Sequence, residues 1–142
     1  MVDRLFAYGT LMCDDIMHAV VGESCQCRNA LLRGYRRRFV AGEEYPAITG
    51  DATEDVRGVL YEPISASAWS RLDRFEGELY RRTTVTVELD NNATQAAQTY
   101  VIRDEHLAQL SSRPWSLECF MQRGKRRFES FYLGFDALRD TP

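Results

Sequence analysis

The stretch on either side of Asn91 and Asn92 constrains the fold most, because it predicts a β-hairpin. Thr83 to Leu89 alternate apolar and polar side chains with a period of two, which is typical of a strand with one buried face. The asparagine pair favours a tight turn, and Gln98 to Ile102 supplies a returning strand. We therefore expect a sheet that is largely antiparallel.

Three further short strands are expected. Arg4 to Tyr8 reads as a buried first strand, and Ala30 to Arg37 as a strand bent near Gly34. Val56 to Tyr61 forms another, stopped by Pro63. So many short strands suit a curled sheet or a small barrel.

Helices are fewer. Asp14 to Val21 and Ser65 to Phe75 place apolar residues at helical spacing, and Gly77 follows the second as a C-cap. A last amphipathic segment runs from about Ser116 to Phe131, and Gly42 to Pro46 is expected to be a loop. The pattern predicts an α+β fold: one domain over residues 1–142, with a compact, largely antiparallel, barrel-like sheet and a few short helices.

Composition excludes some functions. A net charge of -3 and a pI of about 5.4 argue against a general nucleic-acid binder. No apolar run is long enough to span a membrane. Asp3 and Arg4 interrupt the apolar run near the N-terminus that a signal peptide would need, so none is expected. We expect a cytoplasmic protein with reduced thiols. With two histidines and no metal-ligand spacing, a metal site is not expected.

The turn Tyr8-Gly9-Thr10-Leu11 is the first candidate site. A buried strand ends at a glycine and is followed by a hydroxyl residue. Such a turn can direct consecutive backbone N–H groups at a carboxylate or a phosphate, and a glycine lets the backbone approach a ligand closely. On spacing alone, an ordinary strand-to-loop turn explains the same residues.

Glu76 is the second candidate. It follows Phe75 at the end of the predicted helix and precedes Gly77. Partial burial and the helix dipole would both raise its pKa and suit it to proton transfer. The alternative is a solvated glutamate that pairs with Arg81 or Arg82.

The other reactive or charged residues are better explained by ordinary structural roles than by catalysis. Cys13 and His18 are best explained as a buried thiol beside a surface imidazole, and His106 as part of a solvated turn. The basic runs Arg36 to Arg38 and Lys125 to Arg127 suit a solvated edge or an interface. Strand alternation would divide the first run between two faces.

Taken together, the motifs resemble the γ-glutamyl cyclotransferase-like proteins, in particular the AIG2-like branch that includes γ-glutamylamine cyclotransferase. Leu5 to Leu11 is similar to the family's V-F-x-Y-G-T-L signature. The other matching stretches follow in order: Tyr45-Pro46-Ala47-Ile48, Val56 to Tyr61, Leu72 to Gly77 with Tyr80 and Arg82, and then Trp115 and Phe120. These stretches span most of the chain.

The resemblance implies a compact mixed barrel-like fold that acts on a small γ-glutamyl substrate. It implies that the backbone of Tyr8, Gly9, Thr10 and Leu11 cradles the substrate's α-carboxylate and that Glu76 is the catalytic acid and base. Lesser pocket candidates are Tyr45 and Tyr80. The products would be 5-oxoproline and a free amine, without metal or cofactor, from a monomer or homodimer.

Two other functions stay open. A binding module of the same fold could keep the pocket without turnover, and an interaction protein could use the arginine-rich edges.

Overall fold

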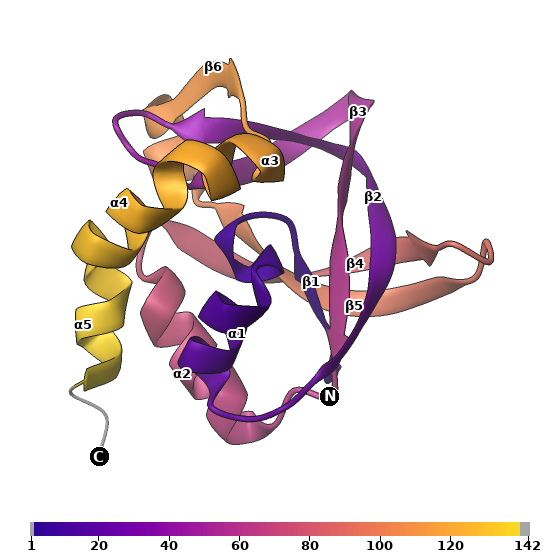
Figure 1. Ribbon diagram of the computed structural model, residues 1–142. Helices are drawn as coiled ribbons and strands as arrows, with labels where there is room; N and C mark the ends of the chain where they lie inside the picture. Colours follow the sequence, from indigo (N-terminus) through magenta and orange to yellow (C-terminus); the bar gives the residue numbers. More distant parts are fainter. Residues whose placement is uncertain (1, 140–142) are drawn as a thin grey trace.

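The computed structural model describes residues 2–139 and consists of a closed β-barrel with helices packed along one side (Figure 1). Neighbouring strands follow the order β3-β1-β5-β4-β2-β6, and β2 also pairs with β3, so that five strands close a ring and β6 extends it. The strands are β1 (Leu5–Ala7), β2 (Gln26–Val40), β3 (Pro46–Glu62), β4 (Tyr80–Leu89), β5 (Thr94–Ile102) and β6 (Leu110–Pro114).

The sheet is mostly antiparallel, as predicted. Within residues 2–139, five of the six strand pairings are antiparallel, and only β1 and β5 run parallel. The mixed α+β, barrel-like fold expected from the sequence is confirmed. Because the ring closes, each of its five strands has a partner on both sides, which protects their backbone polar groups.

The predicted hairpin forms between β4 and β5. Asn92 has a φ of 65°, and its N–H donates to the carbonyl oxygen of Leu89 at 2.9 Å. The returning strand begins at Thr94, four residues before the predicted Gln98, and pairs with β4 from Glu88 onwards.

Strands β2 and β3 are much longer than predicted. The bend expected near Gly34 is present: this residue has a φ of 83°, and the register of β2 on β3 shifts between Arg33 and Tyr35. The loop predicted over Gly42 to Pro46 ends one residue early, since Pro46 opens β3. Residues 47–55, for which the sequence predicted no element, continue that strand.

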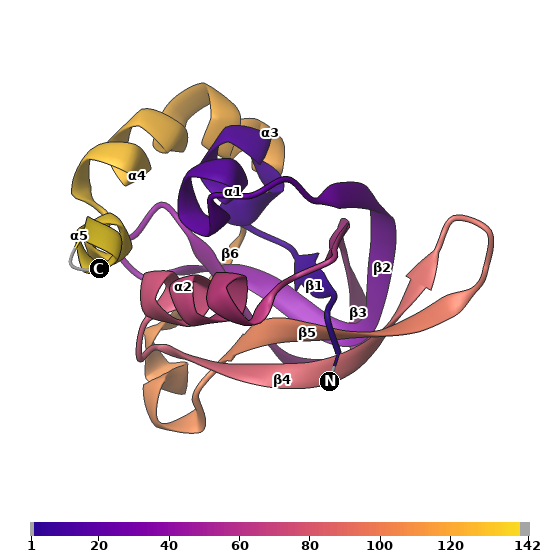
Figure 2. The same cartoon turned by 90° about the horizontal axis from the view of Figure 1, so that it is seen from below.

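The first two helices match their predicted bounds closely and cover one side of the barrel (Figure 2). The Ser65 hydroxyl caps α2 by accepting from the N–H of Ala68 at 3.1 Å. No helix within residues 2–139 is both long and apolar enough to cross a membrane. The helical elements are α1 (Asp14–Val21), α2 (Ala66–Glu76), α3 (Leu117–Cys119), α4 (Lys125–Phe131) and α5 (Leu133–Arg139), with 3₁₀ helices at Thr10–Met12 and Asp104–Gln109 and a π-helical turn at Phe120–Gly124.

Strand β1 lies between two apolar cores. Leu5 and Ala7 pack into the core between the barrel and the helices, whereas Phe6 and Tyr8 pack into the core that fills the barrel. The alternation follows from the period of two in a strand. The point where β1 ends is therefore surrounded by both cores, and the candidate site lies there.

Candidate active site

The turn after β1 is shaped by a close approach to Pro46. A Cβ atom added at Gly9 would lie 2.8 Å from Cγ of Pro46, too close for any other residue to fit without movement. The chain then enters the helical turn Thr10–Met12, where the N–H of Met12 donates to the carbonyl oxygen of Gly9 at 3.0 Å. The N–H groups of Thr10 and Leu11 belong to the first turn, so they have no acceptor within it.

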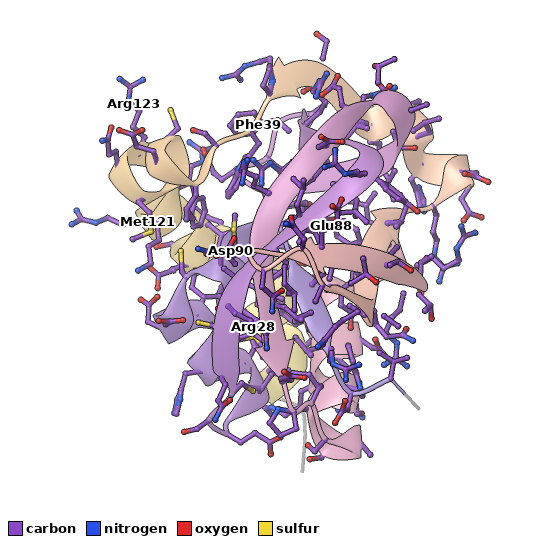
Figure 3. All side chains as sticks on the ribbon, turned by 90° about the vertical axis from the view of Figure 1, so that its right-hand side faces the viewer. Arg28, Phe39, Glu88, Asp90, Met121 and Arg123 are labelled. Atoms are coloured by element: carbon purple, nitrogen blue, oxygen red, sulfur yellow. The ribbon has the colours of Figure 1, made fainter. Side chains whose placement is uncertain are left out.

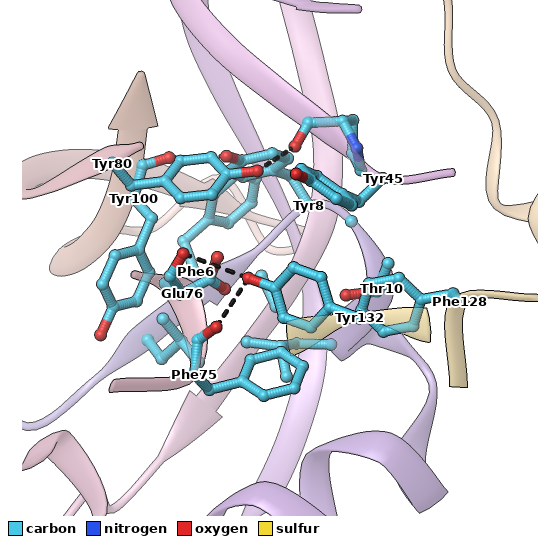
Figure 4. A pocket seen from close by; sticks show the side chains of 15 residues that line it. Phe6, Tyr8, Thr10, Tyr45, Phe75, Glu76, Tyr80, Tyr100, Phe128 and Tyr132 are labelled. Atoms are coloured by element: carbon cyan, nitrogen blue, oxygen red, sulfur yellow. Dashed lines mark hydrogen bonds between the residues drawn. The ribbon is translucent and has the colours of Figure 1, made fainter. Parts of the chain in front are cut away.

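A pocket opens beside this turn (Figure 4). Counted with its open mouth, it encloses about 400 Å³. All seven residues predicted for the site line it, which brings Glu76 and both tyrosine candidates to the same hollow as the turn. The full lining is Leu5, Phe6, Ala7, Tyr8, Gly9, Thr10, Leu11, Tyr45, Pro46, Phe75, Glu76, Tyr80, Tyr100, Phe128 and Tyr132.

Glu76 is the last residue of α2, and its side chain lies among the aromatic rings of the pocket (Figure 4). Counted over all its atoms the residue is half-buried, but its carboxyl group is shielded from water. Burial, followed by the nearby charge of Asp73, raises the pKa of this carboxyl to about 8. The alternative of a solvated Glu76 paired with Arg81 or Arg82 is not seen among the described residues: Arg81 is exposed, and Arg82 lies 3.5 Å from Asp73 instead.

Hydrogen bonds fix the orientation of three lining tyrosines. The Tyr80 hydroxyl donates to the carbonyl oxygen of Pro46 at 2.7 Å, and that of Tyr8 donates to the carbonyl oxygen of Tyr100 at 2.6 Å. The Tyr100 hydroxyl in turn donates to the carboxylate of Asp73 at 2.7 Å. Burial raises the pKa of each of these phenols, which keeps them neutral and able to donate.

Tyr132 ties the segment after α4 to the end of α2. Its hydroxyl donates to the carbonyl oxygen of Phe75 at 2.6 Å and lies 3.1 Å from that of Glu76 (Figure 4). Its ring stacks on Phe128, with the two ring centroids 4.7 Å apart. In the described chain, the Tyr45 hydroxyl is the pocket phenol with no hydrogen bond to protein, and it is available to a ligand.

Sequence reasoning missed the residues that complete this wall, above all Tyr100, Phe128 and Tyr132. Tyr100 falls in the predicted returning strand, but strand alternation does not distinguish a pocket from a core. The helical segment near Phe128 was predicted, and the stacking of its C-terminal end against α2 was not.

The remaining candidates behave as ordinary structural residues. Cys13 is buried, and burial raises the pKa of its thiol to about 11, which leaves it a poor nucleophile. His18 is exposed. The Lys125 ammonium pairs with Asp15 at 2.6 Å.

Carboxylates from the neighbouring strands β3 and β4 lie beside the cations of β2. Arg33 pairs with Glu88 and Asp55, and Figure 3 shows Glu88 and Asp90 on the face that also carries Arg28. This face is mixed in charge rather than uniformly basic.

The geometry supports two chemical tasks. Backbone N–H groups at the Gly9 turn can hold a small anion, and a carboxyl with a pKa near neutrality can accept and return a proton. Aromatic side chains form much of the wall around both.

Comparisons with known proteins agree with this arrangement. Residues 5–117 match the family described as "Gamma-glutamyl cyclotransferase, AIG2-like". The chain is 30% identical to AIG2-like protein C of Arabidopsis thaliana over 139 residues, which is 97% of this chain and 80% of that protein.

Solved structures share the fold. A solution structure of an Arabidopsis thaliana protein superposes with a TM-score of 0.70, at 23% identity, over 98% of this chain and 84% of the other. A structure named gamma-glutamyl cyclotransferase superposes with a TM-score of 0.63, at 18% identity, over 70% of this chain and 66% of the other.

Proposed function

Since this chain belongs to the gamma-glutamyl cyclotransferase, AIG2-like family, we propose that it is a cyclotransferase that converts a γ-glutamyl amine or γ-glutamyl amino acid into 5-oxoproline and a free amine. Within that family we propose the γ-glutamylamine cyclotransferases as its branch. The observation that carries the proposal is the carboxyl of Glu76, with its pKa of about 8, in the same pocket as the Gly9 turn.

The reaction needs few protein groups. The substrate's α-amine attacks its own side-chain carbonyl carbon, a new C–N bond closes a five-membered lactam, and the C–N bond to the leaving amine breaks. Because the attack is intramolecular, folding the substrate into the right shape provides much of the rate. The two protons lost by the α-ammonium end on the leaving amine.

Each part of the pocket has a role in this scheme. Glu76 takes a proton from the α-ammonium and passes it to the leaving nitrogen. Backbone N–H groups of Gly9, Thr10 and Leu11 hold the α-carboxylate and, near the carbonyl, steady the developing negative charge. The rings of Tyr45 and Tyr80 shape the pocket around the glutamyl chain.

A substrate panel tests the proposal. We expect the purified protein to release 5-oxoproline from at least one γ-glutamyl amine or amino acid, measured by chromatography of the product. Thermal stabilisation by 5-oxoproline with no turnover on any member of the panel would favour a binding module instead. If the protein shows no turnover and 5-oxoproline does not stabilise it, the proposal is wrong.

The pH dependence follows from the raised pKa of Glu76. The base must be ionised, so kcat/KM should rise about tenfold per pH unit below 8 and level off above it. It should fall again where the substrate's own ammonium loses its proton. Initial rates of 5-oxoproline release between pH 5 and 10 measure the profile. A rising limb near the ordinary glutamate pKa would contradict the assignment.

A further inference from the structure

Arg37 differs from the arginines on either side of it in β2. Arg36 lies 3.7 Å from the carboxylate of Asp51, and Arg38 makes an ion pair with Glu54 at 2.6 Å. Arg37 projects the other way: its Nη1 donates to the carbonyl oxygen of Tyr8 at 2.8 Å. One cation of the run therefore lies behind the pocket wall.

The surroundings of Arg37 contain a backbone and an aromatic ring but no carboxylate partner among the described residues. Nη1 also donates to the carbonyl oxygen of Arg57 at 3.0 Å, and the guanidinium carbon lies 5.3 Å from the ring centroid of Trp115. Nε is buried and has no hydrogen-bond partner in the described chain. Burial lowers the pKa of this guanidinium. Because no carboxylate among the described residues neutralises this buried cation, its positive charge can attract an anion from the adjacent pocket.

The peptide that Arg37 holds belongs to the candidate site. The bond between Tyr8 and Gly9 is trans, so its C=O and N–H groups point to opposite sides. With the carbonyl oxygen turned to Arg37, the N–H of Gly9 points away from it, and Gly9 lines the pocket. A charged donor on the carbonyl also polarises the peptide, which strengthens its N–H as a donor.

We propose that Arg37 is a positioning residue for the ligand's carboxylate: it fixes the Tyr8–Gly9 peptide so that the Gly9 N–H faces the pocket, and it supplies the positive charge that favours an anionic ligand there. This inference rests on the proposed function, because it takes the substrate's α-carboxylate as the anion.

A matched pair of ligands separates this role from a purely structural one. 5-Oxoproline carries a carboxylate, and its amide has the same ring and shape without the charge. We expect Arg37→Met to weaken binding of 5-oxoproline roughly tenfold or more while binding of the amide changes little. Titration calorimetry measures both affinities. In turnover, KM should rise while kcat stays near that of the unaltered protein, because Glu76 is untouched.

Two variants serve as controls. Arg37→Lys keeps a positive charge and should retain much of the preference for the acid over the amide. Arg36→Met removes a neighbouring cation on the opposite face of β2 and should leave that preference unchanged. Thermal unfolding checks that each variant is folded. If the methionine variant is not, Arg37→Gln, which also removes the positive charge, replaces it in the test.

The outcomes discriminate clearly. Equal losses for the acid and the amide, or no loss for either, would overturn the role of Arg37 while leaving the cyclotransferase proposal intact. If the unaltered protein neither binds 5-oxoproline nor produces it, the proposed function fails, and the inference with it.

Discussion

Replacing Glu76 with glutamine is expected to lower kcat for 5-oxoproline release by roughly a hundredfold to ten-thousandfold, the range that positioned acid–base groups contribute. The change keeps the size and shape of the side chain but removes its ability to carry a proton. Product release by each protein on the best substrate of the panel measures the effect. Because the amide fits the same space, binding of 5-oxoproline should survive.

The same variant should be more stable than the unaltered protein at alkaline pH. Folding raises the pKa of this carboxyl from 4.5 to about 8, so the stability associated with its proton is present below pH 4.5 and is lost as the pH rises through 8. Since a tenfold change in proton affinity corresponds to about 1.4 kcal/mol, this difference in pKa limits the total to about 5 kcal/mol. Denaturant unfolding at pH 5 and pH 9 gives the comparison.

Glu78→Gln is the matched control, since Glu78 lies two residues away and is exposed. It should change neither turnover nor the pH dependence of stability. Full activity in Glu76→Gln would remove this residue from the mechanism. Equal stability of that variant and the unaltered protein at pH 5 and pH 9 alike would show that the carboxyl is not buried as described.

Adding one methyl group at position 9 is expected to have the second largest effect. In Gly9→Ala the new Cβ would lie 2.8 Å from Cγ and 3.0 Å from Cδ of Pro46, so one of the two segments must move. Pro46 also accepts the hydrogen bond of the Tyr80 hydroxyl, which spreads the shift along the pocket wall. Since a misplacement of about 1 Å can lower a rate about a hundredfold, we expect a loss of that order in kcat/KM.

Two control variants show whether the loss of activity in Gly9→Ala comes from displacement of the turn. Gly50→Ala adds the same methyl group in β3, where an added Cβ contacts nothing within 4 Å, and should be active. Thr10→Ser keeps the backbone of the turn and should have a smaller effect than Gly9→Ala, because the proposed contacts come from N–H groups. Normal kcat/KM in Gly9→Ala would show that the turn tolerates displacement.

The fold was most predictable where a local pattern decides it. The alternation in β4 and the asparagine turn predicted the hairpin, and the apolar spacing with the Ser65 cap predicted α2. The first half of β3 was missed because Gly50 and Asp51 are poor strand formers, and pairing with β2 overrides that preference. Helix α5 lies beyond the segment to which the predicted pattern was assigned.

The sequence predicted several residues of the pocket but not the aromatic residues that complete its wall. The residues from the Gly9 turn, Glu76 and the two tyrosines lie around one pocket, while their roles remain proposals. Phe128 and Tyr132 reach the pocket through long-range packing, which no local pattern encodes. Arg37 was recognised only as part of a basic run. Its inward direction depends on the bend and register of β2.

The position of β1 has a consequence for how the molecule is assembled during synthesis. This strand pairs in parallel with β5, and Leu5 lies opposite Gln98, so the first strand must wait for most of the chain before the ring can close. The pocket is completed later still in synthesis, because Tyr132 forms part of its wall. Such distant pairings close slowly. A nascent chain that contains Glu76 but not yet Tyr132 therefore lacks part of the pocket wall, and the ability to bind ligand arises late in synthesis.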